Sequence, residues 1–286
     1  MTSPARTPGV TSKQVAPGAR VPNLLGPSFD ESAPVRPPVA PAPPALRIEG
    51  VQKRFGTGPL VLDGIDLTIA PGEFVCLLGA SGCGKSTLLN LIAGLDKATT
   101  GSIETPAEGS AVMFQESALM PWLSARRNVE LALRLRGVPR RERRAKALAL
   151  LDTVNLADAA EKRPHELSGG MRQRVALARA LAQDSSVLLM DEPFAALDAI
   201  TRDVLHQELT RVWAEQGLSI VFVTHNVREA ARLGQRVVLL GSRPGRVVRE
   251  WKVDIPQPRT IESPGVSALA AEITHELHEE ISRHAS

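Results

Sequence analysis

Cysteine and aromatic residues are scarce in this sequence, and no long apolar run occurs in it. Tyrosine is absent, and only 3% of the 286 residues are aromatic. The two cysteines, Cys76 and Cys83, stand in one short segment, the first in an apolar run and the second in a glycine-rich loop. This placement argues against a structural disulfide and favours a reducing, cytosolic setting. No uninterrupted apolar stretch approaches the roughly 20 residues that span a bilayer, and the N-terminus lacks the apolar core of a signal peptide.

Charge of neither sign dominates the chain. The formal net charge is +3, and lysine and arginine are mixed with aspartate and glutamate over most of the length, so we expect no nucleic-acid partner. The basic run RRERR at 140–144 could contact nucleic acid or lipid headgroups, but the solvated face of a helix explains it better. With 43% hydrophobic and 23% charged residues, the composition is that of a soluble globular protein with a sizeable core.

The two ends of the chain differ from its middle. Residues 1–44 are rich in proline, alanine, serine and glycine, which predicts a disordered tail because so little apolar surface is available for burial. Residues 261–286 predict one C-terminal amphipathic helix that packs on the core or on a partner. Its apolar residues stand at helical spacing: Val266, Leu269, Ile273, Leu277 and Ile281.

The middle of the chain has the alternating pattern of an α/β protein. Residues 46–55 and 61–70 alternate apolar and polar side chains, which predicts antiparallel strands of a small sheet. Continuous apolar runs, typical of buried parallel strands, occupy 73–79, 186–191, 219–224 and 236–240. Helical spacing follows the first run at 86–95, and a further helix over 201–217 is closed by Gly217. Residues 121–165 are helical and rich in arginine, which predicts a helical insertion.

A glycine-rich loop joins the first parallel strand to its helix. Gly79, four residues, and then Gly84, Lys85 and Ser86 match the pattern of a phosphate-binding loop. Glycine lets the backbone approach an anion closely, and the N–H groups at the helix start point toward it. Lys85 would reach the β- and γ-phosphates, and Ser86 would bind Mg²⁺. The alternative is a strand-to-helix turn with an incidental lysine, which the flanking strand and helix disfavour.

Other polar residues stand at the ends of apolar strands. Asp191 and Glu192 end one run, so Asp191 could hold Mg²⁺ and Glu192 could act as general base on water, although adjacent acids are also common in solvated turns. His225 and Gln115 end two other runs and could contact the γ-phosphate or the attacking water. A lone strand-end histidine is more often structural. Asp198 is explained equally by a helix N-cap.

These motifs resemble the ATP-binding cassette (ABC) ATPases over about residues 45–260. The motifs that carry the resemblance, in order and spacing, are GASGCGKST at 79–87, Gln115, LSGG at 167–170, LLMDEP at 188–193, ALD at 196–198 and His225. The resemblance implies a RecA-like P-loop NTPase core, an antiparallel β subdomain and an inserted helical subdomain at about 116–180. It also implies two cassettes that pair head to tail around two ATP molecules.

Carried over residue by residue, the resemblance assigns a role to each matching position. It implies that ATP is bound by Phe55, Gly79, Ala80, Ser81, Gly82, Cys83, Gly84, Lys85, Ser86 and Thr87. It implies catalytic roles for Glu192, His225 and Gln115, and Mg²⁺ ligands at Ser86, Gln115 and Asp191. The ATP of the other subunit is implied to meet Ser168, Gly169, Gly170 and Asp198. Phe55 stands where tyrosine is commoner, and its alternative is a core residue at a strand end.

A finer resemblance points to one group of importers. The segments LMPWLSARRNV, DAITRDVLHQELTRVW, GSRPGRVV and VDIPQPR look like the nitrate/sulfonate/taurine/bicarbonate importers. This implies a homodimer of ATPase subunits at the cytoplasmic face of the inner membrane, joined to integral permease subunits and a periplasmic or lipid-anchored binding protein. Aliphatic sulfonate or taurine is the favoured solute, and nitrate or bicarbonate is the alternative. Leu119, Met120 and Trp122 are placed to receive a permease helix or, equally, to pack locally.

Two rival classes fit less well. A soluble ABC protein of translation or DNA repair would show two cassettes or a long coiled-coil insertion, and a scaffold would have lost Lys85, Glu192 or His225. Met171, Asn226 and Ala195 depart from the commoner residues of the family, and none removes a group assigned to the chemistry. His275 and His278 share a helix face, but they lack the further ligands of a metal site.

Overall fold

The computed structural model describes residues 43–283. The predicted tail at 1–44 therefore lies outside the described residues except for its last two positions, and residues 284–286 also lie outside. Between 43 and 283, no helix is both long and apolar enough to cross a membrane.

A six-stranded sheet forms the centre of the fold and positions the site. The first five strands in its order run parallel, and β9 pairs antiparallel with β8 at the edge. In spatial order the strands are β5 (Ser110–Met113), β6 (Val187–Asp191), β7 (Ser219–Val223), β3 (Phe74–Gly79), β8 (Arg236–Leu240) and β9 (Val247–Lys252). The sheet confirms the parallel strands that the apolar runs predict, because β3 and β7 are buried on both faces.

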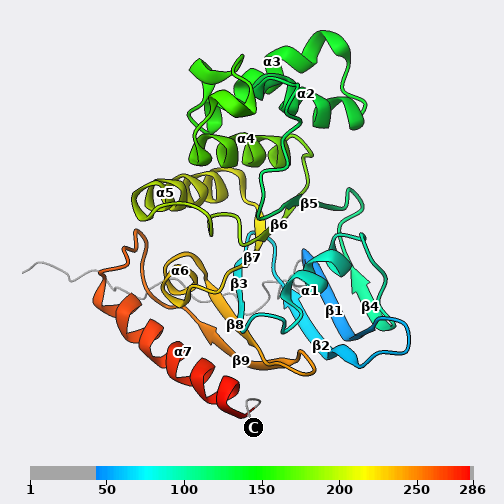
Figure 1. The fold of residues 1–286 in the computed structure, drawn as a ribbon, viewed down its shortest axis with the longest axis vertical. Coiled ribbons are helices and arrows are strands. Elements are labelled where there is room, and N and C mark those ends of the chain that lie inside the picture. The colour runs from blue at the N-terminus through cyan, green and yellow to red at the C-terminus, as the bar shows by residue number, and fades with distance from the viewer. Residues whose placement is uncertain (1–42, 284–286) are drawn as a thin grey trace, which may run out of the picture. The chain divides into compact units, whose positions relative to one another are not determined.

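A smaller antiparallel sheet lies beside the large one (Figure 1). Its order is β2 (Leu60–Ile69), β1 (Leu46–Arg54) and β4 (Thr100–Glu104), which confirms the predicted pairing of the first two strands. Helix α1 (Lys85–Ile92) follows β3, and its buried leucines share one hydrophobic cluster with β1, β2 and β3. This shared core fixes the loop between β3 and α1.

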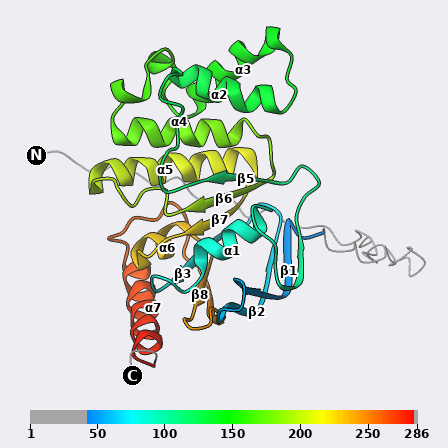
Figure 2. The same cartoon turned by 45° about the vertical axis from the view of Figure 1, so that its right-hand side comes forward.

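Helices cover the large sheet and build the insertion. The segment between β5 and β6 contains α2 (Ala125–Leu135), α3 (Arg140–Thr153) and α4 (Gly169–Leu181), which gather at the top of Figures 1 and 2. Two short 3₁₀ turns, Ala157–Ala159 and Pro164–Glu166, join α3 to α4. Ser124 caps α2 by accepting from Arg127 N, and buried Asn128 donates to the carbonyls of Met120, Leu123 and Ser124. These bonds fix the entry into the insertion.

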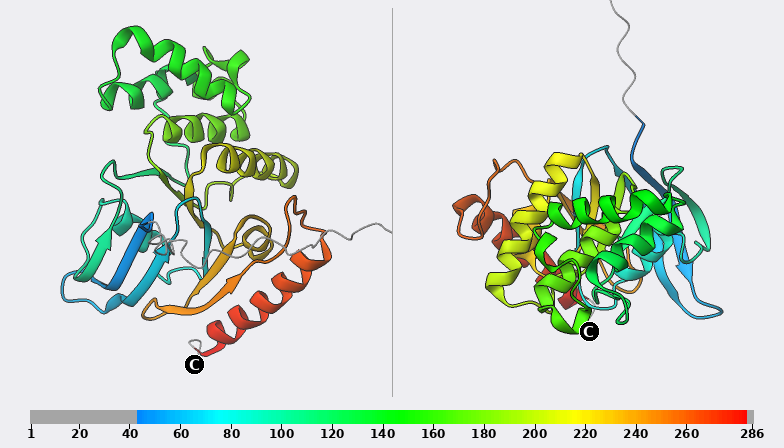
Figure 3. Two further views of the ribbon diagram at one scale, coloured as in Figure 1. Left: turned by 180° about the vertical axis from the view of Figure 1, so that it is seen from behind. Right: turned by 90° about the horizontal axis from the view of Figure 1, so that it is seen from above.

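Three further helices complete the fold. Helix α5 (Ala199–Gln216) ends at Gly217, whose φ of 64° is the left-handed conformation typical of a helix end, as predicted. Helix α6 (Val227–Leu233) lies between β7 and β8 in the chain, and α7 (Pro264–Arg283) runs beside α6 and β9 (Figure 3). The predicted apolar row of α7 is buried at Val266 and Ile273, but Ile281 is exposed.

Candidate functional site

The candidate residues gather where the parallel strands end. The loops after β3, β5, β6 and β7 carry, in turn, the phosphate loop, Gln115, the Asp191–Glu192 pair and His225. Because β3, β5, β6 and β7 are parallel in one sheet, their carboxyl ends meet at one edge, where open α/β sheets bind ligands. The topology therefore brings together residues that lie more than 100 positions apart in sequence.

The phosphate loop is held in a shape that requires glycine. Gly84, which precedes α1, has a φ of 100°, and a Cβ there would lie 2.6 Å from Leu62 Cδ2. The ammonium of Lys85 donates to the carbonyl oxygens of Gly79 at 2.9 Å and Ala80 at 3.0 Å. Lys85 is buried and folded back along the loop, and its charge also lowers the pKa of the Asp191 carboxyl. The ammonium of Lys85 therefore lies inside the loop at the start of α1.

The start of α1 fits a phosphate. Helix α1 has no side-chain cap and no acidic residue in its first turn, which leaves its N–H groups and positive dipole end open to an anion. Ser81 and Gly82 are exposed at the loop tip, whereas Cys83 is buried with its Sγ 3.8 Å from Lys85 Nζ. Burial raises the pKa of the Cys83 thiol, and Lys85 partly opposes this. Cys83 thus contributes packing and backbone to the loop.

Ser86 and Asp191 form the oxygen pair expected of a magnesium site. The Ser86 side chain lies close enough to the Asp191 carboxyl to lower its pKa. Burial raises the pKa of Asp191, Ser86 and Lys85 lower it, and neighbouring Glu192 raises it. Residues 43–283 hold no cluster of three His, Cys, Asp or Glu that could cage a metal. One hydroxyl and one carboxylate suit Mg²⁺, which keeps water and phosphate ligands.

Glu192 and His225 make direct contact. Glu192 Oε2 lies 2.8 Å from His225 Nδ1. The backbone of Glu192 has a φ of 44°, a left-handed conformation that is rare for glutamate, and its N–H donates to Val223 O at 3.0 Å. The His225 side chain is 64% exposed and that of Glu192 only 23%. Strained backbone conformations of this kind are concentrated at functional sites. Here the conformation of Glu192 directs its carboxylate toward His225.

The second glycine-rich stretch opens helix α4. Ser168 is its N-cap and accepts from Met171 N at 3.2 Å. Gly170 lies against α5, and a Cβ there would fall inside van der Waals distance of Thr201 Cγ2. In both Figure 1 and Figure 2, α4 lies apart from α1. Ser168–Gly170 therefore do not complete the phosphate loop of their own chain.

Gln115 lies beside a groove at the start of α4. The exposed Gln115 accepts at its main-chain oxygen from Gln173 Nε2 at 2.9 Å, which ties the loop after β5 to α4. A groove of about 620 Å³ is lined here by Gln115, Leu119, Gly169, Arg172, Gln173 and Leu197, among others. Leu119 packs on the main core, whereas Trp122 is 68% exposed. Of the predicted apolar cluster, only Trp122 stands out into solvent.

Asp198 and Phe55 complete the predicted set. Asp198 is the N-cap of α5 and accepts from Thr201 N at 3.0 Å, and this bond lowers the pKa of Asp198. Phe55 is 53% exposed just after β1, with Lys53 Nζ 4.6 Å from its ring centre. The alternative of a core residue is therefore wrong for Phe55. An exposed ring beside a cation is a platform on which a base can stack.

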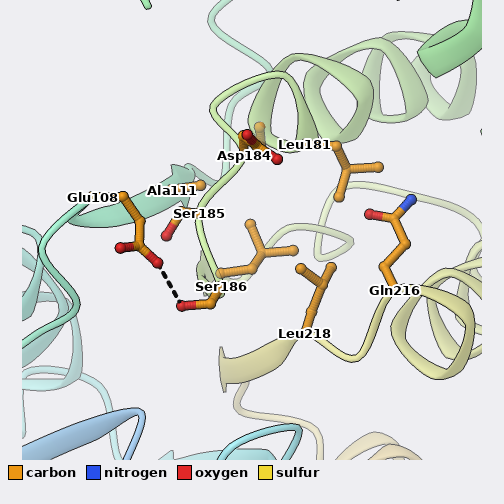
Figure 4. Close-up of a pocket in the computed structure, with 10 residues that line it drawn as sticks. Glu108, Ala111, Leu181, Asp184, Ser185, Ser186, Gln216 and Leu218 are labelled. Carbon is orange, nitrogen blue, oxygen red and sulfur yellow. Dashed lines mark hydrogen bonds between the residues drawn. The ribbon is translucent and has the colours of Figure 1, made fainter.

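A separate hollow lies at the opposite edge of the sheet (Figure 4). It has a volume of about 450 Å³ and lies where β6 and β7 begin, between Leu181 at the end of α4 and Gln216 at the end of α5. Ser186 Oγ donates to Glu108 Oε1 at 3.0 Å across its rim. None of the predicted site residues lines it, so it is separate from the site described above.

Sequence reasoning missed a buried group behind the site. His206 of α5, Glu229 of α6 and Thr224 after β7 are all buried and hydrogen-bonded to one another. No motif marks them, because α5 and α6 meet only in the folded chain. A buried histidine on a helix carries no signal that distinguishes it from a core residue.

The fold and the strand-end constellation define a P-loop ATPase of the cassette class, and comparisons give the family. The family model described as ABC transporter matches residues 62–195. The taurine import ATP-binding protein TauB of Chromobacterium violaceum is 48% identical over 213 residues, covering 72% of this chain and 82% of that protein. The nitrate import ATP-binding protein NrtD of Synechocystis sp. is 48% identical over 204 residues, covering 69% and 77%. The chain belongs to the family of ABC transporter ATP-binding proteins.

A solved structure supports the same assignment. The dimeric ATP-binding cassette MJ0796, in a post-hydrolysis state bound to ADP and Pi, is 36% identical with a TM-score of 0.64. The match covers 74% of this chain and all of that chain. The predicted fold class and the predicted resemblance are thereby confirmed.

Proposed function

We propose that this chain is the Mg²⁺-dependent, ATP-hydrolysing subunit of an ABC importer. The observation that carries the proposal is the 2.8 Å contact between Glu192 and His225 at the same sheet edge as the phosphate loop. The contact supports a carboxylate and an imidazole that act together on an attacking water. Phosphoryl transfer needs little else from the protein than positioned charge and an oriented water.

Each residue supports one part of the reaction. The open N–H groups of α1 and the ammonium of Lys85 hold the β- and γ-phosphates once Lys85 exchanges loop carbonyls for phosphate oxygens. Ser86 and Asp191 would hold Mg²⁺, which neutralises charge that develops on the phosphates. Glu192 takes the proton of the attacking water, and His225 orients Glu192 and contacts the γ-phosphate. Gln115 would join the metal site, and Phe55 would stack on the adenine.

The second half of each site comes from another copy of the chain. Ser168, Gly169 and Gly170 start a helix whose N–H groups suit the γ-phosphate, but they lie apart from α1 of the same chain. Asp198, at the start of α5, would lie at the seam. The relative of known structure is dimeric, which supports a homodimer here. A head-to-tail pair would place each α4 start over the partner's phosphate loop.

Membrane partners follow from the importer relatives. The groove beside Gln115 and the exposed Trp122 supply a surface for a helix of a permease subunit, which would hold the ATPase at the cytoplasmic face of the inner membrane. A periplasmic or lipid-anchored binding protein completes the importer. Within the chain, we divide an ATPase domain at 45–260, including a helical subdomain at about 116–180, from the C-terminal helix.

Aliphatic sulfonate or taurine is the solute we favour, and nitrate or bicarbonate is the alternative. Relatives named for taurine and for nitrate import are equally similar at 48% identity, and relatives named for aliphatic sulfonates and bicarbonate import reach 47% and 43%. Similarity alone therefore does not rank the solutes. The finer segment resemblance supports the nitrate/sulfonate/taurine/bicarbonate group as a whole, and within that group aliphatic sulfonate or taurine is our first choice. Solute-stimulated ATP hydrolysis by the assembled complex, measured with taurine, an alkanesulfonate, nitrate and bicarbonate, decides between them.

Two variants test the ATPase proposal. Glu192→Gln removes the base and keeps the shape, so we expect ATP binding with turnover lowered by about 10²-fold or more. Lys85→Ala removes the phosphate-binding ammonium, so we expect weaker ATP binding in equilibrium titration with Mg²⁺ present. Normal turnover by Glu192→Gln contradicts the role of Glu192, and unchanged affinity in Lys85→Ala contradicts the phosphate loop. Chelation of Mg²⁺ should abolish hydrolysis by the unmodified chain.

A further inference from the structure

A chain of buried hydrogen bonds lies directly behind the Glu192–His225 pair. His206 Nε2 lies 2.5 Å from Glu229 Oε1, and Thr224 Oγ1 donates to Glu229 Oε2. The same Thr224 hydroxyl accepts from Asn226 N at 3.0 Å. His206 is 1% exposed, so water does not compete for these bonds. This series of hydrogen bonds starts at His206 on α5 and ends in the loop that carries His225.

The direction of these bonds follows from their chemistry. In the part of the chain that the structure describes, His206 Nδ1 is buried and has no hydrogen-bond partner. A carboxylate only accepts, so His206 Nε2 carries a proton and donates it in the hydrogen bond to Glu229. Both oxygens of Glu229 are thereby occupied, one by His206 and one by Thr224. Removing either donor would leave a buried carboxylate oxygen unsatisfied, which is costly.

The hydrogen bonds of Thr224 and Asn226 fix the backbone on both sides of His225. Thr224 is anchored through its hydroxyl and through its N–H, which donates to Leu77 O at 3.2 Å. Asn226 is anchored by its N–H and by its side chain, which caps α6 by accepting from the N–H groups of Arg228 and Glu229. The ring of His225 is itself mostly exposed, so side-chain packing does not position it. Its contact with Glu192 depends on the anchored loop.

Helix α5 is tied to the Glu192 side of the site as well. The ring of Phe194, two residues after Glu192, lies 5.6 Å from the His206 ring, centroid to centroid. Arg202, one turn before His206, donates to Leu197 O at 2.6 Å and to Phe194 O at 3.3 Å. His206 therefore contacts the loop that carries Glu192 directly, through Phe194, and reaches the loop that carries His225 through Glu229 and Thr224.

We infer that His206 is a positioning residue for ATP hydrolysis. It acts through Glu229 and Thr224 on the loop that presents His225 to Glu192. The inference rests on the proposed function of Glu192 and His225. Because His206 is buried on α5 behind the Glu192–His225 pair, its loss should change turnover and leave ATP binding unchanged.

Three variants of the full chain separate positioning from general stability. His206→Phe fills the space and removes the donor, whereas His206→Gln keeps an amide N–H at a position close to that of Nε2. Val212→Ala is the control, because Val212 is buried on the same helix and takes no part in the polar chain. For each variant, kcat and KM for ATP, the melting temperature and the crystallographic Glu192–His225 distance are measured.

We expect His206→Phe to lower kcat about tenfold with KM changed less than about twofold, and to separate Glu192 from His225. His206→Gln should keep kcat within about threefold of the unmodified chain and keep the contact. Val212→Ala should have a lower melting temperature than the unmodified chain and an unchanged kcat. Where His206→Phe does not fold, His206→Asn, whose shorter amide does not reach Glu229, takes its place.

Two results overturn the inference. One is an intact Glu192–His225 contact in His206→Phe, and the other is a kcat loss no larger than that of Val212→Ala. An unmodified chain that does not hydrolyse ATP contradicts the proposed function instead. The measured distance then still decides whether His206 positions the loop.

Discussion

Gly170 is required by its neighbour on α5, and this can be tested residue by residue. A Cβ at this position would overlap Thr201 Cγ2. We expect Gly170→Ala to lower the free energy of unfolding by about 1–3 kcal/mol, measured by chemical denaturation. The higher helix propensity of alanine offsets only about 0.5–1 kcal/mol of this overlap.

The overlapping atom can be removed to check the cause. Thr201→Ser deletes Cγ2 and keeps the N–H that donates to Asp198. In the Gly170→Ala background it should restore stability to that of the unmodified chain or above, because only the gain in helix propensity remains. A double variant as unstable as Gly170→Ala alone would show that the backbone, and not Thr201, requires the glycine.

Helix α5 is also joined to the helical insertion through one buried acid. Glu208 Oε1 accepts from Asn155 Nδ2 at 2.7 Å, and Glu208 Oε2 lies 2.9 Å from Arg174 Nε on α4. The latter pair is close but poorly aligned for a hydrogen bond. Burial raises the pKa of Glu208, and Arg174 and Asn155 oppose this shift only in part. The carboxylate is therefore less stable in the folded chain than in the unfolded one.

The raised pKa of Glu208 predicts a pH dependence of stability. Between the ordinary glutamate pKa and the raised one, the folded chain binds more protons than the unfolded chain, so its stability falls as pH rises through this window. Glu208→Gln keeps the acceptor for Asn155 and cannot ionise. We expect the difference in unfolding free energy, variant minus unmodified chain, to grow more positive across the window. A constant difference would show that Glu208 does not titrate there.

The parallel strands could be predicted from sequence because short continuous apolar runs are typical of strands that are buried on both faces. The pattern of the phosphate loop could also be recognised in the sequence, since its glycines and lysine all lie within residues 79–85. The bond between His206 and Glu229 was not, because it joins positions 23 apart on helices whose packing no local pattern describes. The C-terminal helix shows the same limit, as Glu280 is buried there while Ile281 is exposed. The periodicity of apolar residues predicts a helix, but it does not determine which residues at the edge of the apolar face become buried in the folded protein.

At the scale of the whole molecule, the two glycine-rich stretches predict two half-sites in each chain. The phosphate loop precedes α1, and Ser168–Gly170 begin α4, which lies apart from α1. Only association of two chains would bring unlike halves together. Specific ATPase activity should therefore rise with protein concentration, and a flat dependence would argue for an active monomer.

A mixing experiment separates sites made within one chain from sites made between two. Lys85→Ala disables the phosphate-loop half, and Ser168→Arg blocks the α4 half, so each variant alone should be inactive. In a mixed dimer, the intact phosphate loop of the Ser168→Arg chain meets the intact α4 start of the Lys85→Ala chain, which rebuilds one site of the two. Random pairing at equal concentrations makes half of the dimers mixed, so we expect about a quarter of the unmodified activity. Sites built within a single chain would give no recovery on mixing, because every such site would carry one of the two substitutions.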